Sequence, residues 1–170
     1  MSGTQHTLVA LVEDKPGVLN RMASLFRRRG FNIDSIAVGH SEQPNFSRIT
    51  IVVNGSTPVV EQVRKQLDKI IDVVKVTEIS SDEMVNRELA LIKVKANSTT
   101  RSEIMQIVDI FRANIVDVGA DSVVVEVTGN EDKIDSLYNL LRGFGIKELA
   151  RTGQLAMTRG GANPLNGDKD

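Results

Sequence analysis

The 170-residue sequence contains no cysteine and no tryptophan, and aromatic residues make up only 4% of it. The absence of cysteine excludes disulfide bonds, thiolate metal sites and cysteine nucleophiles, and it fits a reducing compartment. The scarcity of aromatic side chains leaves few rings on which unpaired bases could stack. Single-stranded nucleic acid is therefore a poor candidate for a partner.

The sequence also lacks an excess of charge of either sign, because 21 basic residues are balanced by 22 acidic ones and the formal net charge is −1. No polybasic or acidic arm is present to bind nucleic acid or an anionic membrane. The apolar run 8–12 ends at Glu13 and Asp14, and no basic region precedes it. This run is too short for a signal peptide or a membrane span. We expect a cytoplasmic protein that binds neither nucleic acid nor membranes.

Apolar residues account for 41% of the chain, enough to build a buried core. Short β-rich runs alternate with segments in which apolar residues recur at helical spacing. In the first half, the predicted order is strand, helix, strand, strand, helix, strand, over residues 8–12, 19–29, 31–39, 46–53, 57–70 and 73–79. The second half repeats this order over residues 89–94, 100–111, 115–119, 123–128, 130–142 and 146–157.

The repeat predicts an α+β protein built from two tandem ferredoxin-like βαββαβ domains. We expect the first domain over residues 1–80 and the second over residues 87–158, with a polar linker around 80–87. Residues 159–170 read RGGANPLNGDKD and are predicted to be a flexible tail.

The face of the first predicted sheet that the two helices do not cover is also expected to be buried. In a βαββαβ unit both helices pack on the same face of the sheet, and the other face meets water or a partner. Strand 8–12 is apolar at every position, so both of its faces are expected to be buried. Oligomerisation is the simplest way to bury the second face, so we expect a homodimer.

Catalytic constellations are nearly absent from the sequence. His6 and His40 show no metal-ligand spacing and are expected to be solvated in a terminus and a loop. The acidic pairs 13–14 and 131–132 suit capping and solvation better than acid-base chemistry. No P-loop is present, and the GFGI segment 143–146 lacks the third glycine of a dinucleotide-binding turn. The residues therefore indicate a protein that is not an enzyme and holds no metal.

The segment EDKPGVLN, residues 13–20, has the most chemical promise. A strand ends, the chain turns through Pro16 and Gly17, and a helix begins, so unpaired backbone N–H groups and the helix dipole favour a carboxylate there. Asp14 and Asn32 could meet across an interface and bind an ammonium group. An amino acid would satisfy both groups, although a plain strand-to-helix turn explains the same pattern.

Longer stretches carry a family resemblance. TLVALVEDKPGVLNRMASLFRRRGFNIDSIAVG, SRITIVV and RELALIKV together make residues 5–160 resemble the regulatory (small) subunit of acetohydroxyacid synthase, also called acetolactate synthase. The resemblance implies an ACT domain first and a second ferredoxin-like domain after it. It also implies a non-catalytic chain that activates the catalytic large subunit and confers feedback inhibition by valine, or sometimes by other branched-chain amino acids. Thiamine diphosphate, Mg and FAD would belong to that catalytic partner.

The resemblance also implies an effector site between two ACT domains of a dimer. Its residues would be Asp14, Lys15, Pro16, Gly17, Val18, Asn32 and Ile33. Several family members carry Asn where this chain has Asp14, and a carboxylate there would favour the ammonium group of the effector. Val18 and Ile33 would form an apolar wall for a branched side chain. The alternative function is a freestanding amino-acid-binding ACT sensor that regulates another enzyme, and co-purification with a large thiamine-dependent subunit would separate the two.

Overall fold

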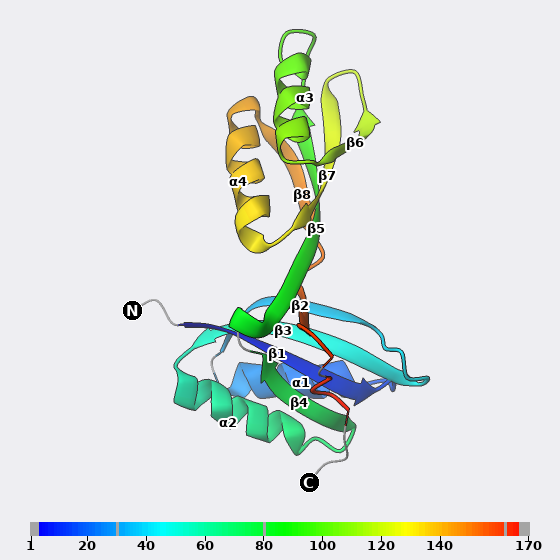
Figure 1. The fold of residues 1–170 in the computed structure, drawn as a ribbon, viewed down its shortest axis with the longest axis vertical. Coiled ribbons are helices and arrows are strands. Elements are labelled where there is room, and N and C mark those ends of the chain that lie inside the picture. Colours follow the sequence, from blue (N-terminus) through cyan, green and yellow to red (C-terminus); the bar gives the residue numbers. More distant parts are fainter. Residues whose placement is uncertain (1–3, 30, 80, 162, 167–170) are drawn as a thin grey trace. The chain divides into compact units, whose positions relative to one another are not determined.

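The computed structural model describes residues 4–29, 31–79, 81–161 and 163–166. The chain divides into two compact units (Figure 1). The first unit comprises the chain up to Val85 together with the chain from Gln154 onward, and the second comprises Asn86–Gly153. The second unit is therefore an insertion within the first.

The first unit has the predicted βαββαβ order. Its elements are β1 (Thr4–Glu13), α1 (Val18–Arg29), β2 (Asn32–His40), β3 (Phe46–Gly55), α2 (Thr57–Asp68) and β4 (Val73–Ile79). The strands form an antiparallel sheet in the order β2-β3-β1-β4. Both helices lie on one side of this sheet (Figure 1).

Alternation along the strands builds the core of the first unit. Leu8 and Ala10 of β1 lie opposite Ile51 and Ile49 of β3, and all four are fully buried. They pack against the apolar stripes of α1 and α2, which include Val18, Met22, Phe26, Val60, Val63 and Leu67. Burying each large apolar side chain contributes about 1.5–3 kcal/mol, so this layer holds the helices on the sheet.

The second unit repeats the order. It contains β5 (Met84–Lys95), which begins in the first unit, and then α3 (Arg101–Ile110), β6 (Asn114–Val118), β7 (Ser122–Gly129), α4 (Glu131–Leu141) and β8 (Ile146–Arg151). The sheet order is β6-β7-β5-β8, and α3 and α4 lie on one side of it (Figure 1). The prediction of two ferredoxin-like units is confirmed.

The predicted strand 146–157 is wrong, because it is two strands. β8 ends at Arg151, and β9 (Leu155–Thr158) pairs with β5. Between them Gly153 adopts a φ of 83°, a left-handed conformation that favours glycine and interrupts an extended strand. The chain from Gln154 onward therefore belongs to the first unit, whereas the sequence pattern extended the second domain to residue 158.

The chain covers the second face of its own first sheet, where we expected a partner subunit. We call this face, which is turned away from α1 and α2, the open face, and residues 154–161 and 163–165 the C-terminal strap. On the open face, Val9, Leu11 and Ile79 form a buried cluster with Ala156 and Leu165 of the strap. Arg48 Nη2 also donates a hydrogen bond of 2.7 Å to the carbonyl of Ala156.

The strap also revises the expectation of a flexible tail over residues 159–170. Leu165 is only 4% exposed, and its amide donates to Asn163 Oδ1 at 3.1 Å. The amide of Arg159 donates to the carbonyl of Glu83 at 2.7 Å. Residue 162 and residues 167–170 lie outside the described part of the chain.

An ion pair with one buried partner joins β5 and β8 in the second unit. Arg151 donates to both carboxylate oxygens of Glu88, whose side chain is only 4% exposed, at 2.8 and 2.9 Å. These bonds raise the pKa of Arg151, and Arg151 also bonds Asp135. Arg151→Ala removes the hydrogen-bonded cation from the buried Glu88 carboxylate, so we expect urea unfolding to show a loss of about 1.5–3 kcal/mol.

Lys147→Ala is the matched control for this prediction. Its partner Asp121 is largely exposed, and such pairs contribute about 0–1 kcal/mol. Equal losses in the two variants would contradict a larger contribution from the Arg151–Glu88 pair.

Candidate functional site

The turn after β1 is open and has a defined backbone. The amide of Asp14 donates to the carbonyl of Asn45 at 2.9 Å, and the amide of Lys15 donates to that of Glu13 at 2.9 Å. Gly17 has a φ of 88°, which favours glycine, and a Cβ atom there would meet no atom within 4 Å. The turn therefore leaves free space beside Gly17.

The N-terminus of α1 borders this space. The first helical hydrogen bond runs from the amide of Arg21 to the carbonyl of Gly17 at 3.0 Å, so the amides of residues 18–20 precede the helical ladder. No acidic residue lies in the first turn of α1. A small anion such as a carboxylate would meet both the amides and the positive end of the helix dipole.

Val18 does not fit its expected role as an apolar wall. Its side chain is only 2% exposed and belongs to the core stripe with Met22 and Phe26. Only its backbone amide faces the start of the helix. The helical spacing of the sequence placed the neighbouring Leu19 on the apolar face of the helix, but Leu19 is 46% exposed and is the apolar side chain available beside the turn.

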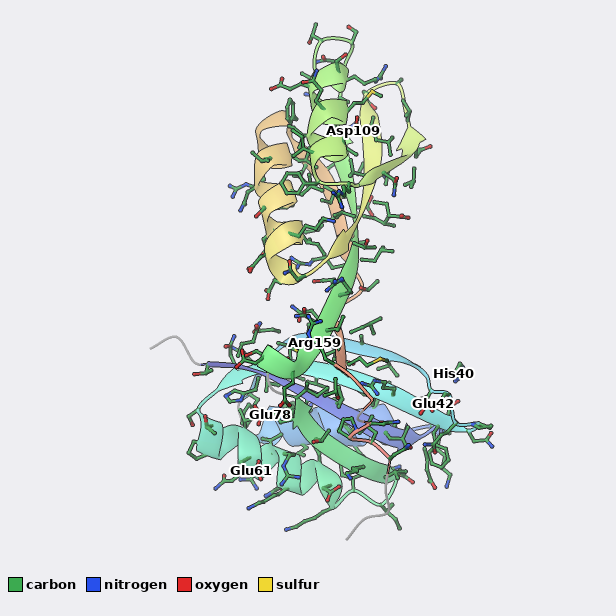
Figure 2. The ribbon with its side chains drawn as sticks, viewed as in Figure 1. His40, Glu42, Glu61, Glu78, Asp109 and Arg159 are labelled. Carbon is green, nitrogen blue, oxygen red and sulfur yellow. The ribbon has the colours of Figure 1, made fainter. Side chains whose placement is uncertain are left out.

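The side chains near the turn include one neighbour that the sequence did not indicate. His40 Nδ1 lies 3.5 Å from Asp14 Oδ2, and both side chains are exposed. Figure 2 shows His40 and Glu42 at the end of the β2–β3 hairpin. Lys15 Nζ instead contacts Glu13 Oε2 at 2.8 Å. Asp14 is thus within reach of the His40 imidazole.

Asn32 and Ile33 lie at the start of β2. Asn32 is exposed and lies opposite Asn54 of β3. Ile33 is half-buried against the core. The next residue, Asp34, accepts a hydrogen bond from Asn54 Nδ2 at 2.6 Å. The side-chain amide of Asn32 therefore faces solvent at the beginning of an edge strand.

The structure does not bring the two groups of predicted site residues together within one chain. The 14–18 turn precedes α1, and Asn32 follows it. A 12-residue helix spans about 18 Å, which exceeds the size of one amino acid.

An unpartnered apolar edge runs along β2 and α1. β2 is an edge strand in the sheet order. Leu19 of α1 and Ile36 and Val38 of β2 are each 43–47% exposed. A free strand edge next to apolar side chains is a surface that pairs readily with another strand.

His6 differs from its expected solvated state. It lies in β1, is buried, and its Nδ1 atom bonds Glu78 of β4; Glu78 is labelled in Figure 2. A pocket of about 450 Å³ adjoins this pair, at the opposite end of β1 from the 14–18 turn. Within residues 4–29, 31–79, 81–161 and 163–166, no cluster of three His, Asp or Glu residues could hold a metal ion. No helix in these ranges is long and apolar enough to cross a membrane.

Comparison with protein families identifies the class of the chain. The first unit matches, over residues 8–75, the family model described as "AHAS small subunit-like ACT domain". The chain thus joins an ACT domain to a second ferredoxin-like domain. The second unit matches the model "Small subunit of acetolactate synthase" over residues 87–160. With the relatives below, these matches show that the chain belongs to the acetolactate synthase small-subunit family.

Similar proteins cover nearly the whole chain. The probable acetolactate synthase small subunit of Archaeoglobus fulgidus is 57% identical over 92% of this chain and 98% of its own length. The acetolactate synthase small subunit of Mycobacterium bovis is 51% identical over 94% and 95%. The crystal structure of the Thermotoga maritima small subunit superposes with a TM-score of 0.87 at 45% identity, covering 94% of this chain and 99% of that one.

Proposed function

We propose that this chain is the non-catalytic regulatory subunit of an acetolactate synthase, which activates the catalytic large subunit and confers feedback inhibition by valine. Family membership supports a large-subunit partner, because a small subunit implies a larger one. The observation that carries the effector role is the open turn at Gly17 next to the backbone amides of residues 18–20, which precede the helical ladder of α1.

A zwitterionic amino acid matches the chemistry of this site. Its carboxylate would accept hydrogen bonds from the amides of residues 18–20, where the helix dipole is favourable. Its ammonium group would meet the carboxylate of Asp14 and the side-chain oxygen of Asn32. Ile33 and the exposed part of Leu19 offer apolar surface for a branched side chain. Lys15 and Pro16 shape the turn.

A homodimer is part of this proposal. The free edge of β2 and the exposed side chains of Leu19, Ile36 and Val38 support pairing of two ACT domains. Such pairing is also the arrangement that brings Asn32 of one copy to the turn of the other. The dimer surface would thus lie at the β2 edge, since the strap already covers the open face.

The remaining parts of the proposal concern the partner. Thiamine diphosphate, Mg and FAD would be bound by the catalytic large subunit, and the complex would act in the cytoplasm. A freestanding ACT sensor remains the other hypothesis, but the match of both units to the small-subunit family does not favour it.

Reconstitution tests the proposed function directly. Adding this chain to its catalytic large subunit should raise acetolactate synthesis, and valine, leucine or isoleucine should then inhibit the complex but not the large subunit alone. The absence of both effects with a subunit that binds this chain would refute the proposal.

Asn32→Ala tests the contribution of the β2 side of the site. A hydrogen bond to a charged group contributes about 1.5–3 kcal/mol, so calorimetry should show valine affinity reduced roughly 10- to 150-fold. The exposed Asn114 begins β6 as Asn32 begins β2, and Asn114→Ala is therefore the matched control. Equal valine affinity in the two variants would contradict a role for Asn32.

A further inference from the structure

The point at which the chain returns from the second unit is fixed to β2. The second unit ends at Gly153, and the C-terminal strap begins at Gln154, which is only 5% exposed. The backbone amide of Gln154 donates a hydrogen bond of 2.8 Å to Ser35 Oγ. Ser35 belongs to β2, so the strand that begins with Asn32 also holds the first residue of the strap.

Ser35 lies close to the proposed effector residues along β2. Only Asp34 separates it from Ile33, and the pairing of β2 with β3 shifts register between Ile33 and Ser35. Such an irregularity re-aims a strand and is frequent next to functional sites. A displacement of Asn32 or Ile33 on effector binding would therefore reach Ser35 through three or two peptide units, respectively.

The rest of the strap is held by other strands. Arg48 of β3 bonds the carbonyl of Ala156, and Leu165 packs on the Val9 and Leu11 side chains of β1. The Ser35 bond thus joins β2 to a strap that is otherwise held by β1, β3, β4 and β5. This bond lies directly between the effector strand and the connection to the second unit.

We propose that the hydrogen bond from Gln154 to Ser35 couples effector binding at β2 to the second unit, and so transmits feedback inhibition. The inference rests on the effector site proposed above. Inhibition requires a contact that differs in free energy between the effector-bound and effector-free states, and a residue that carries this difference can change inhibition without changing binding. Ser35 is a positioning residue in this scheme.

Ser35→Ala in the full-length chain, reconstituted with the catalytic large subunit, tests the coupling. Calorimetry on the variant alone should give a valine affinity close to that of the parent. In the complex, the valine concentration for half-inhibition should rise about 5- to 150-fold, the range of typical allosteric couplings, or inhibition should become partial.

Two further variants act as controls. Ser35→Thr keeps a hydroxyl group at this position and should retain inhibition. Ser41 follows β2, and its Oγ atom donates to the carbonyl of Phe46 at 2.9 Å. Ser41→Ala also removes a serine hydrogen bond to the backbone, but away from the strap, and should leave inhibition at the parental level.

The outcomes separate the coupling from the effector site. If the parent binds valine and Ser35→Ala is inhibited like the parent, the coupling is wrong and the effector site stands. If Ser35→Ala loses affinity and inhibition in proportion, Ser35 belongs to the binding site and the coupling is again wrong. If the parent binds none of valine, leucine and isoleucine, the proposed function itself fails, and the coupling fails with it.

Hydrogen exchange on the parent gives a second test that needs no variant. Valine should change the exchange rate of the Gln154 amide, whose acceptor is Ser35 Oγ. An unchanged rate at saturating valine would overturn the coupling.

Discussion

Gly17→Asp is expected to abolish inhibition by valine while the catalytic subunit is still activated. The new carboxylate would enter the free space beside Gly17, where the carboxylate of the effector would meet the amides of α1. Two like charges 4 Å apart repel by about 4 kcal/mol at an effective dielectric of 20, which corresponds to a loss of roughly a thousandfold in affinity. Inhibition curves and calorimetry would measure this loss.

Gly17→Asn is the control that isolates the charge. Asn has nearly the shape of Asp, and both tolerate the left-handed backbone that the φ of 88° requires. The Asn variant should keep much more of the valine sensitivity than the Asp variant. Equal losses of valine sensitivity in the two variants would show that the backbone of the turn matters and not the charge. Full valine sensitivity of Gly17→Asp would show that the turn is not part of the effector site.

The order of elements could be predicted from the sequence because it depends on local periodicity. The helical spacing of Val60, Val63 and Leu67 marks α2, and the alternation of Ile49, Ile51 and Val53 marks β3. Each pattern repeats in the second half. The register of the buried stripe was less certain: α1 begins at Val18, so the spacing of Val18, Met22 and Phe26 turns Val18 inward and leaves Leu19 exposed.

The C-terminal strap could not be predicted because its contacts are remote in sequence. The apolar positions Val9 and Leu11 indicated correctly that the open face is covered. Nothing local to Leu165, an isolated apolar residue in a segment rich in Gly, Asn and Pro, shows that it packs on β1. The separation of the proposed effector residues into two groups could be predicted in part, because the 14–18 turn and Asn32 lie at opposite ends of one predicted helix.

A chain cut after residue 82 is expected to lose the fold of the first unit or to aggregate into assemblies larger than a dimer. It lacks the strap, so Val9, Leu11 and Ile79 on the open face lose the cover that Ala156 and Leu165 give them. Full exposure of one such side chain costs about 1.5–3 kcal/mol, and a whole domain is stable by only about 5–15 kcal/mol. Circular dichroism and size-exclusion chromatography would detect either result, and a folded chain that behaves as a discrete dimer would contradict it.

Excision of the second unit with the strap retained is the matched variant. The amide of Thr152 donates to the carbonyl of Leu89 at 3.0 Å, so these two residues are neighbours on antiparallel segments. Deleting residues 90–151 and joining Leu89 to Thr152 through Asn-Gly, a pair suited to tight hairpins, keeps the whole strap, including β9. This variant should fold and bind valine with an affinity near that of the full chain.

The excised variant also separates activation from inhibition. It retains the ACT unit, its β2 edge and the Ser35 to Gln154 bond, so we expect measurable activation of the catalytic subunit. A domain that only binds an effector supplies no differential free energy unless the rest of the assembly responds. Without the second unit, valine should therefore bind and yet inhibit much less than it inhibits the complex with the full chain. Inhibition equal to that of the full chain would mean that the ACT unit alone transmits the signal, and that the second unit serves another purpose.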